Sequence, residues 1–137
     1  MGGLTDESRQ LRVLVVDDEE AIGRALRLLL SRAGYAVEVL RTGAAAEVLL
    51  AERHFDCLVL DYRIPDVRGD ELYLYAVGVQ PHLRGRAVFM TGDITERVHA
   101  TIDETGCHRL EKPFDVHAML EAVHRMTADM RQQDAAG

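Results

Sequence analysis

The sequence predicts an α/β fold in which five parallel strands form a doubly wound sheet flanked by five helices. Two observations support this prediction. Short apolar runs alternate along the chain with longer stretches in which apolar side chains recur at helical spacing, and the first and third of these runs end abruptly at an aspartate. Strands that are buried on both faces of a parallel sheet have this continuous apolar character. Alternating strands and helices favour right-handed crossovers in one such sheet.

The first elements are the clearest. Residues 11–16 form a nearly unbroken apolar run that stops at Asp17, as expected of a strand buried on both faces. From residue 20 to residue 33, apolar side chains recur at helical spacing, and Gly34 provides a stop. Residues 35–41 then alternate between apolar and polar side chains, which predicts an edge strand with one less-buried face.

The middle of the chain repeats this pattern. Thr42 is a candidate cap for a second helix that ends near Glu52. Residues 55–60 are another apolar strand, which ends sharply at Asp61. Proline and glycine then mark a loop before a third helix over residues 70–79.

The last third of the chain supplies the remaining elements. Residues 87–90 form a fourth apolar run, and residues 107–111 form the fifth and most polar strand. Between them, Asp93 and Glu96 resemble a capping box that opens a helix over residues 94–104.

One domain is expected over residues 11–130, with an N-terminal extension at residues 1–10 and a flexible tail at residues 131–137. The chain is long enough for an apolar core without disulfides or metals. Asp115 is expected to cap the final helix. Because the second and fifth strands are the most polar, they should be the edges of the sheet, which gives the order 2-1-3-4-5. Ligands bind such sheets at the carboxyl ends of the strands.

Composition excludes several classes of function. A net charge of -7 argues against direct binding of DNA, whose phosphates require clustered basic residues. Cys57 and Cys107 lie far apart, so they are expected to be small buried hydrophobes in a reducing compartment. No signal peptide is visible, and no apolar run approaches the roughly 20 residues that span a bilayer. We therefore expect a cytoplasmic protein without a membrane segment.

Five polar side chains are predicted to converge at the carboxyl ends of the strands: Asp17, Asp18, Asp61, Thr91 and Lys112. Three carboxylates in one crevice repel one another and raise one another's pKa unless a cation compensates. Magnesium, which prefers oxygen ligands, suits such a site, and manganese is the alternative ion. The lysine is the only one among 16 basic residues, which indicates a site that requires a compact ammonium instead of a planar guanidinium.

Four short motifs stand at these strand ends in a fixed order. They are VVDDE at 15–19, LDYRIP at 60–65, MTG at 90–92 and KPF at 112–114. Together they resemble the receiver domain of two-component response regulators, of the single-domain type found among chemotaxis regulators, over roughly residues 12–130. The resemblance implies a flavodoxin-like fold and a phosphorylated switch in signal transduction.

The resemblance also implies a role for each acid. Asp61 matches the phosphoacceptor, which attacks the phosphohistidine of a sensor histidine kinase or phosphotransfer protein. Asp18 and Asp61, with the backbone carbonyl of Arg63, match the magnesium ligands. Asp17 matches the acid that holds the waters of the ion.

The remaining matches concern the response to phosphorylation. Lys112 matches the lysine that pairs with the phosphoacceptor and then with the phosphoryl group, and its bond to Pro113 is expected to be cis. Thr91 matches the hydroxyl that moves to the phosphoryl group. The implied protein is a switch that controls a downstream protein, with only self-phosphorylation and self-dephosphorylation activity. A homodimer through the last strand and the helices beside it is a candidate assembly.

Two departures from the family pattern give further hypotheses. Arg109 stands where the family has Tyr or Phe, so we expect a charged contact on the face around the fifth strand. Arg63 and Asp93 lie two residues after the phosphoacceptor and the threonine. We expect them to pair across the mouth of the site and to slow the loss of the phosphoryl group.

Two other classes of function stay open at this point. Haloacid-dehalogenase-type phosphatases combine similar residues, but their nucleophile follows the first strand in an Asp-x-Asp pattern, whereas the best candidate here, Asp61, follows the third. The other alternative is an interaction module that keeps the fold without using phosphorylation. The missing aromatic at Arg109 leaves that alternative open.

Overall fold

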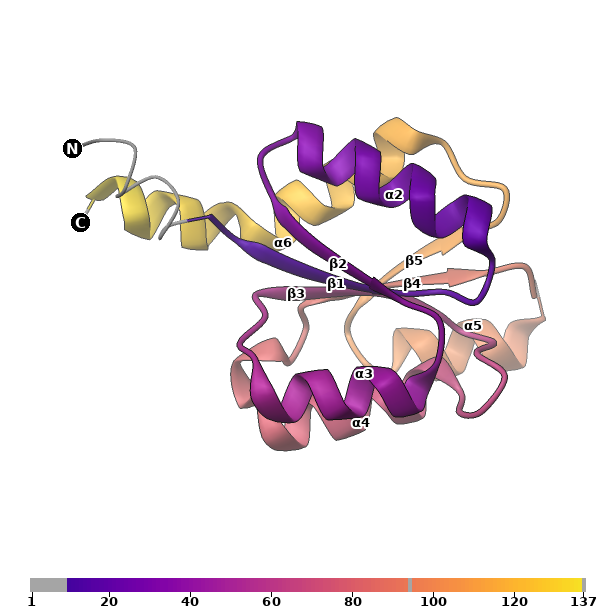
Figure 1. Cartoon of the computed structure of the whole chain (residues 1–137). Helices are drawn as coiled ribbons and strands as arrows, with labels where there is room; N and C mark the ends of the chain where they lie inside the picture. Colours follow the sequence, from indigo (N-terminus) through magenta and orange to yellow (C-terminus); the bar gives the residue numbers. More distant parts are fainter. Residues whose placement is uncertain (1–9, 94, 137) are drawn as a thin grey trace.

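The computed structural model describes residues 10–93 and 95–136, with side chains up to Arg131. Five parallel strands form a single sheet between two layers of helices (Figure 1). The strands are β1 (Arg12–Val16), β2 (Ala36–Leu40), β3 (Cys57–Asp61), β4 (Ala87–Thr91) and β5 (His108–Glu111). The helices are α2 (Glu20–Arg32), α3 (Gly43–Glu52), α4 (Gly69–Val79), α5 (Glu96–Asp103) and α6 (Val116–Ala136), with a short 3-10 turn at Pro81–Leu83.

The strand order is β2-β1-β3-β4-β5, which confirms the predicted doubly wound topology. Every residue of β3 and β4 is buried, whereas β2 is half-buried along its whole length and β5 is half-buried or exposed. The two polar strands are therefore the edges. The burial follows from the sequence, because only continuous apolar runs can lie in the centre of a sheet that is covered on both faces.

Side chains of alternating strand residues supply two separate cores. Leu58 and Leu60 of β3 point to the layer that contains α3, α4 and α5. Cys57 and Val59 belong to the other core, which lies between the sheet and the layer of α2 and α6. Figure 1 shows these two layers on opposite faces of the sheet. All four side chains are fully buried. This period of two places Asp61, the last residue of β3, at the edge where the strand leaves the sheet.

The predicted start of the helix at residues 94–104 was wrong. The helix α5 begins at Glu96, and its cap is Thr95, whose Oγ1 accepts a hydrogen bond from the backbone N–H of Val98 at 3.4 Å. Asp93 instead accepts the N–H of Thr95 at 2.9 Å and pairs with Arg63. Asp93 therefore precedes the helix as part of the loop and does not cap it. Residue 94 lies outside the described residues.

The other two predicted caps are confirmed. Thr42 Oγ1 accepts a hydrogen bond from Ala45 N at 3.1 Å at the start of α3. Asp115 Oδ1 accepts one from His117 N at 2.7 Å at the start of α6. Both caps satisfy backbone N–H groups that have no partner inside the first helical turn.

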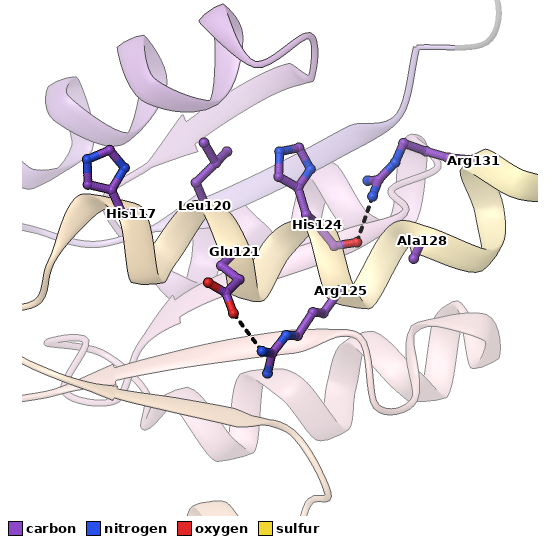
Figure 2. A pocket seen from close by; sticks show the side chains of 7 residues that line it. All are labelled: His117, Leu120, Glu121, His124, Arg125, Ala128 and Arg131. Atoms are coloured by element: carbon purple, nitrogen blue, oxygen red, sulfur yellow. Dashed lines mark hydrogen bonds and ion pairs between the residues drawn. The ribbon is translucent and has the colours of Figure 1, made fainter.

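The helix α6 continues to Ala136, past residue 131 at which we placed the start of a tail. Arg131 donates to the hydroxyl of Tyr35 at 2.8 Å and to the carbonyl of His124 at 2.9 Å, the second of which is drawn in Figure 2. Asp129 pairs with Arg86 at 2.6 Å. These contacts hold the helix where it extends beyond the sheet. The expected N-terminal extension lies almost wholly outside the described residues, and the domain boundaries stay predictions.

Both cysteines are free, with Cys57 buried and Cys107 half-buried. Burial raises the pKa of the Cys57 thiol to about 12, so this residue is an inert part of the core. Within residues 10–93 and 95–136, no helix combines the length and the apolar character that crossing a membrane requires.

Candidate functional site

The site lies at the carboxyl edge of the sheet, where neighbouring parallel strands end side by side. Asp17 directly follows β1, and Asp61 is the last residue of β3. Thr91 ends β4 opposite Glu111 of β5, which places Lys112 one residue beyond this pair. The backbone N–H of Lys112 bonds to the carbonyl of Thr91 at 2.8 Å. Segments from four parts of the chain therefore meet here.

Lys112 is at the centre of the charged cluster. Its Nζ donates to Asp17 Oδ2 at 3.0 Å, to Glu19 Oε1 at 2.9 Å and to Asp61 Oδ2 at 3.3 Å. The side chains of Asp17 and Asp61 are 0% and 7% exposed, and that of Lys112 is 15% exposed. The predicted convergence of the lysine with two of the aspartates is thus present in the structure, together with a third acid.

The charges in this cluster do not balance, because three carboxylates share one ammonium. Burial and the neighbouring charge of Asp17 raise the pKa of Asp61 to about 6, although Lys112 and the N–H of Arg63 act in the opposite direction. For Lys112, burial lowers the pKa, but the hydrogen bonds to Glu19 and Asp17 and the charge of Asp61 outweigh this effect, so the net pKa is above its usual value. The site therefore favours an additional cation.

The donor set suits a hard divalent cation. Asp17, Glu19 and Asp61 each offer a carboxylate oxygen, and these oxygens lie within 4.8 Å of one another. Carboxylate oxygens are the ligands that magnesium prefers in proteins. Asp18, which we predicted as a ligand, is outside this group, and its side chain is half-buried.

Glu19 is the member that the sequence did not assign. Asp17 Oδ1 accepts the backbone N–H of Glu19 at 2.8 Å, and this local turn directs the chain back over the site. The side chain of Glu19 is 58% exposed and still reaches Lys112. The signal was present as the third acid of the run Asp17-Asp18-Glu19, but an acidic run does not reveal which of its members turn inward.

Thr91 is buried and is held by the loop that follows β4. Its Oγ1 accepts the N–H of Asp93 at 2.9 Å and lies 3.3 Å from the Asp93 carbonyl. No described hydrogen bond joins this hydroxyl to Asp61 or to the ammonium of Lys112. The structure therefore places Thr91 beside the acidic cluster without engaging it.

The expected pair between Arg63 and Asp93 is present. The guanidinium of Arg63 contacts the carboxylate of Asp93. The hydrogen bonds from the Thr95 N–H and from Arg63 lower the pKa of Asp93 to about 2. The contact is partly exposed, with 70% of the Arg63 side chain open to solvent, so it is a weak and salt-sensitive pair.

Two features of the backbone shape the site: a cis peptide bond and a glycine with no space for a side chain. The bond between Lys112 and Pro113 is cis, as predicted. Gly69 is a glycine because a Cβ there would lie 2.5 Å from the carbonyl oxygen of Asp61. The loop after β3 therefore returns directly past the candidate nucleophile, and no larger residue fits at that point.

Arg109 makes a contact within the chain. Its guanidinium pairs with the carboxylate of Asp103, the last residue of α5. The charged contact predicted for this face therefore links β5 to α5.

A family model for the response regulator receiver domain matches residues 13–124. The chain belongs to this family. Response regulators of this kind act in two-component signal transduction, and receiver domains are in general regulatory switches that bind Mg²⁺ at an acidic pocket. This receiver chain has the acidic cluster in the expected place, at the carboxyl ends of β1 and β3.

Known proteins similar to this receiver support the same assignment. The response regulator MprA of Mycobacterium tuberculosis is 32% identical over 126 residues, which are 92% of this chain and 54% of the relative. The receiver chain thus spans about half the length of such curated relatives. The signal receiver domain of an HD domain-containing protein from Pseudomonas fluorescens Pf-5 superposes with a TM-score of 0.80 at 27% identity, covering 91% of this chain and 92% of that one. The non-phosphorylated HemR receiver domain of Leptospira biflexa gives a TM-score of 0.77 at 30% identity, covering 85% and 94%.

The family assignment does not favour the haloacid-dehalogenase-type phosphatase that the sequence left open. Lys112 contacts both Asp17 and Asp61, but the residue two positions after Asp17 is Glu19, so the run after the first strand does not have the Asp-x-Asp pattern of such phosphatases.

Proposed function

We propose that this receiver accepts a phosphoryl group on Asp61 from the phosphohistidine of a sensor histidine kinase or phosphotransfer protein. One observation carries the proposal: the ammonium of Lys112 lies 3.3 Å from Asp61 Oδ2 and is fixed there by Asp17 and Glu19. A buried carboxylate beside a fixed cation is an arrangement that can receive a group with negative charge.

In the proposed reaction an oxygen of Asp61 attacks phosphorus, the bond from phosphorus to the imidazole nitrogen breaks, and the imidazole leaves. The nucleophile must be the ionised carboxylate. Because the pKa of Asp61 is about 6, most of the protein carries that form at neutral pH. Lys112 compensates the charge on the transferred oxygens, so the chain supplies the nucleophile and the positioning.

Magnesium would bind to Asp17, Asp18, Asp61 and the backbone carbonyl of Arg63, with Glu19 as a further oxygen donor. When bound, the ion neutralises charge between the acids and the incoming phosphoryl oxygens. The excess of carboxylates over ammonium groups at this site supports this part of the proposal. Manganese has similar ligand preferences and is expected to substitute.

The proposed switch involves the loop after β4. The Thr91 hydroxyl exchanges its bonds to Asp93 for a bond to the phosphoryl group, which requires the loop to move. The added charge of roughly two units favours the moved conformation, in which a downstream protein is controlled. The pair between Arg63 and Asp93 covers the mouth of the site and slows hydrolysis of the acyl phosphate.

The proposed setting is the cytoplasm, since both cysteines are free, as in a reducing compartment. The acidic charge of the chain supports a protein target over direct contact with DNA. A homodimer through α5, β5 and α6 is the assembly we propose to test, and the Arg109 and Asp103 pair belongs to this face.

The test is incubation with a small acyl phosphate, with and without Mg²⁺, followed by intact mass measurement. The wild-type protein should gain one phosphoryl group in the presence of Mg²⁺, and Asp61→Asn should gain none. Asp129→Asn is the matched control, because it removes an acid from α6, away from the site, and should label like the wild type. A wild-type protein without the adduct would refute phosphoryl acceptance and favour a phosphorylation-independent interaction module.

A further inference from the structure

The loop between β3 and α4, residues 62–68, carries the Arg63 carbonyl and is attached to the rest of the fold at both ends. At its start, the N–H of Tyr62 bonds to the carbonyl of Met90 at 2.8 Å. At its end, the N–H of Gly69 bonds to the carbonyl of Tyr62 at 2.8 Å, and Arg63 forms an isolated antiparallel bridge with Arg68. These bonds close the loop but leave its tip to be fixed by other contacts.

The tip is held by a polar contact with another part of the fold. Asp66 Oδ1 accepts the N–H of Gly43 at 2.8 Å, and Asp66 Oδ2 accepts the N–H of Ala44 at 2.9 Å. These are the first two residues of α3. The two hydrogen bonds lower the pKa of Asp66 below its usual range, so the carboxylate stays charged at neutral pH and below.

An apolar contact lies beside the polar one. Val67 packs against Gly43 so closely that a Cβ on the glycine would lie 2.2 Å from Val67 Cγ1. Val67 is half-buried and belongs to the core on this face of the sheet. Together, Asp66 and Val67 attach the loop tip to the N-terminus of α3.

Ordinary helix capping does not account for this arrangement, because α3 already has a cap. Thr42 satisfies the N–H of Ala45 from the position just before the helix. Asp66 comes from a loop 23 residues away in the sequence. Its carboxylate therefore fixes the loop to α3 and also accepts the free N–H groups at the start of that helix.

We propose that Asp66 is a positioning residue that, by holding the loop tip on α3, sets the place of the Arg63 carbonyl for Mg²⁺ binding. This inference rests on the proposed function, in which that carbonyl is a ligand. Arg63 is also held by its bridge to Arg68 and its pair with Asp93, so the loss of Asp66 would shift the loop without releasing it. Because magnesium requires near-ideal octahedral geometry, a small shift of one ligand is enough to weaken binding. Residues that orient ligands typically change metal affinity about 10-fold or more when they are removed.

The experiment measures the Mg²⁺ affinity of the unphosphorylated protein by isothermal titration calorimetry, with urea unfolding in EDTA as the measure of stability. Asp66→Ala should weaken Mg²⁺ binding by about 10-fold. Asp66→Asn, which keeps one acceptor oxygen, should fall between Asp66→Ala and the wild type. Thr42→Ala is the matched control: it removes a cap from the same helix without touching the loop, and should lower the urea midpoint while leaving Mg²⁺ affinity within about twofold.

A second variant separates the loop attachment from helix stability. In Gly43→Ala the new methyl group must displace Val67, whereas alanine favours the helix itself. This variant should also weaken Mg²⁺ binding if the attachment matters. Unchanged affinity in both Asp66→Ala and Gly43→Ala, or an equal loss in Thr42→Ala, would overturn the inference. A wild-type protein that binds no Mg²⁺ and forms no adduct would instead refute the proposed function.

Discussion

Replacing Asp61 by asparagine should stabilise the metal-free protein at pH 8. Burial and the charge of Asp17 raise the pKa of Asp61 from 3.8 to about 6, so the folded protein binds this proton more tightly than the unfolded chain does. The stability that this proton contributes is fully present below pH about 4 and is lost as the pH rises through about 6. Asparagine resembles the protonated acid in shape and cannot ionise, so the variant does not undergo this loss.

The size of the effect follows from the two pKa values. Each pKa unit corresponds to about 1.4 kcal/mol, so ionised Asp61 lowers the free energy of unfolding by about 2 to 3 kcal/mol at pH 8. Between pH about 4 and about 6, the advantage of Asp61→Asn should grow by about 1.4 kcal/mol per pH unit and then level off. The 7% exposure of the Asp61 side chain leaves little room for solvent to screen the effect.

The assay is urea unfolding of both proteins in EDTA, followed by circular dichroism across this pH range. Adding Mg²⁺ at pH 8 should stabilise the wild type and leave Asp61→Asn nearly unchanged, because only the wild type has the complete ligand set. A difference in unfolding free energy that stays constant from pH about 4 to about 8 would refute the assigned cause, which is the ionisation of a buried acid.

Three further predictions follow from single contacts. Asp129→Asn should show the opposite pH dependence, because Arg86 lowers the pKa of Asp129 to about 2. The stability that ionised Asp129 contributes is present above pH about 4 and is lost as the pH falls towards 2. Equal urea midpoints of Asp129→Asn and the wild type at neutral pH would contradict this. Lys112→Arg should reduce the rate at which the phosphoryl adduct forms by about 10-fold or more, because the planar guanidinium does not fit between three acids as the ammonium does. A wild-type rate, measured by intact mass, would show that the positive charge alone is sufficient. Arg63→Ala should speed the loss of the phosphoryl group by a few fold, because an exposed ion pair such as Arg63 and Asp93 contributes about 0.2 to 1 kcal/mol. An unchanged or slower rate of dephosphorylation would show that the pair does not protect the phosphoryl group.

Much of the fold could be predicted because it depends on local patterns. The apolar runs at β1, β3 and β4 are buried on both faces, and the more polar β2 and β5 are the edges. The start of α5 could not be predicted, because Asp93 and Thr95 are both good caps. Asp93 pairs with Arg63, which lies 30 residues before it in the sequence, and no local pattern indicates such a contact.

The site, too, has residues that the sequence predicted and contacts that it did not. The sequence placed Asp17, Asp61 and Lys112 at adjoining strand ends, and the structure brings their charged groups together. It did not indicate that Glu19 turns towards Lys112, because that contact depends on the backbone turn at Asp17.

By itself the sequence determined the strand order, the edge of the sheet where the charged residues gather and the family of the protein. These features follow from the periodicity of side chains and from residues fixed at strand ends. Only the tertiary structure decided which acid joins the cluster and how the loop after Asp61 is held. The attachment of Asp66 to α3 joins segments 23 residues apart, and such a contact exists only after the sheet and its helices have packed. Hydrogen bonds between distant segments depend on that packing, which no local pattern in the chain specifies.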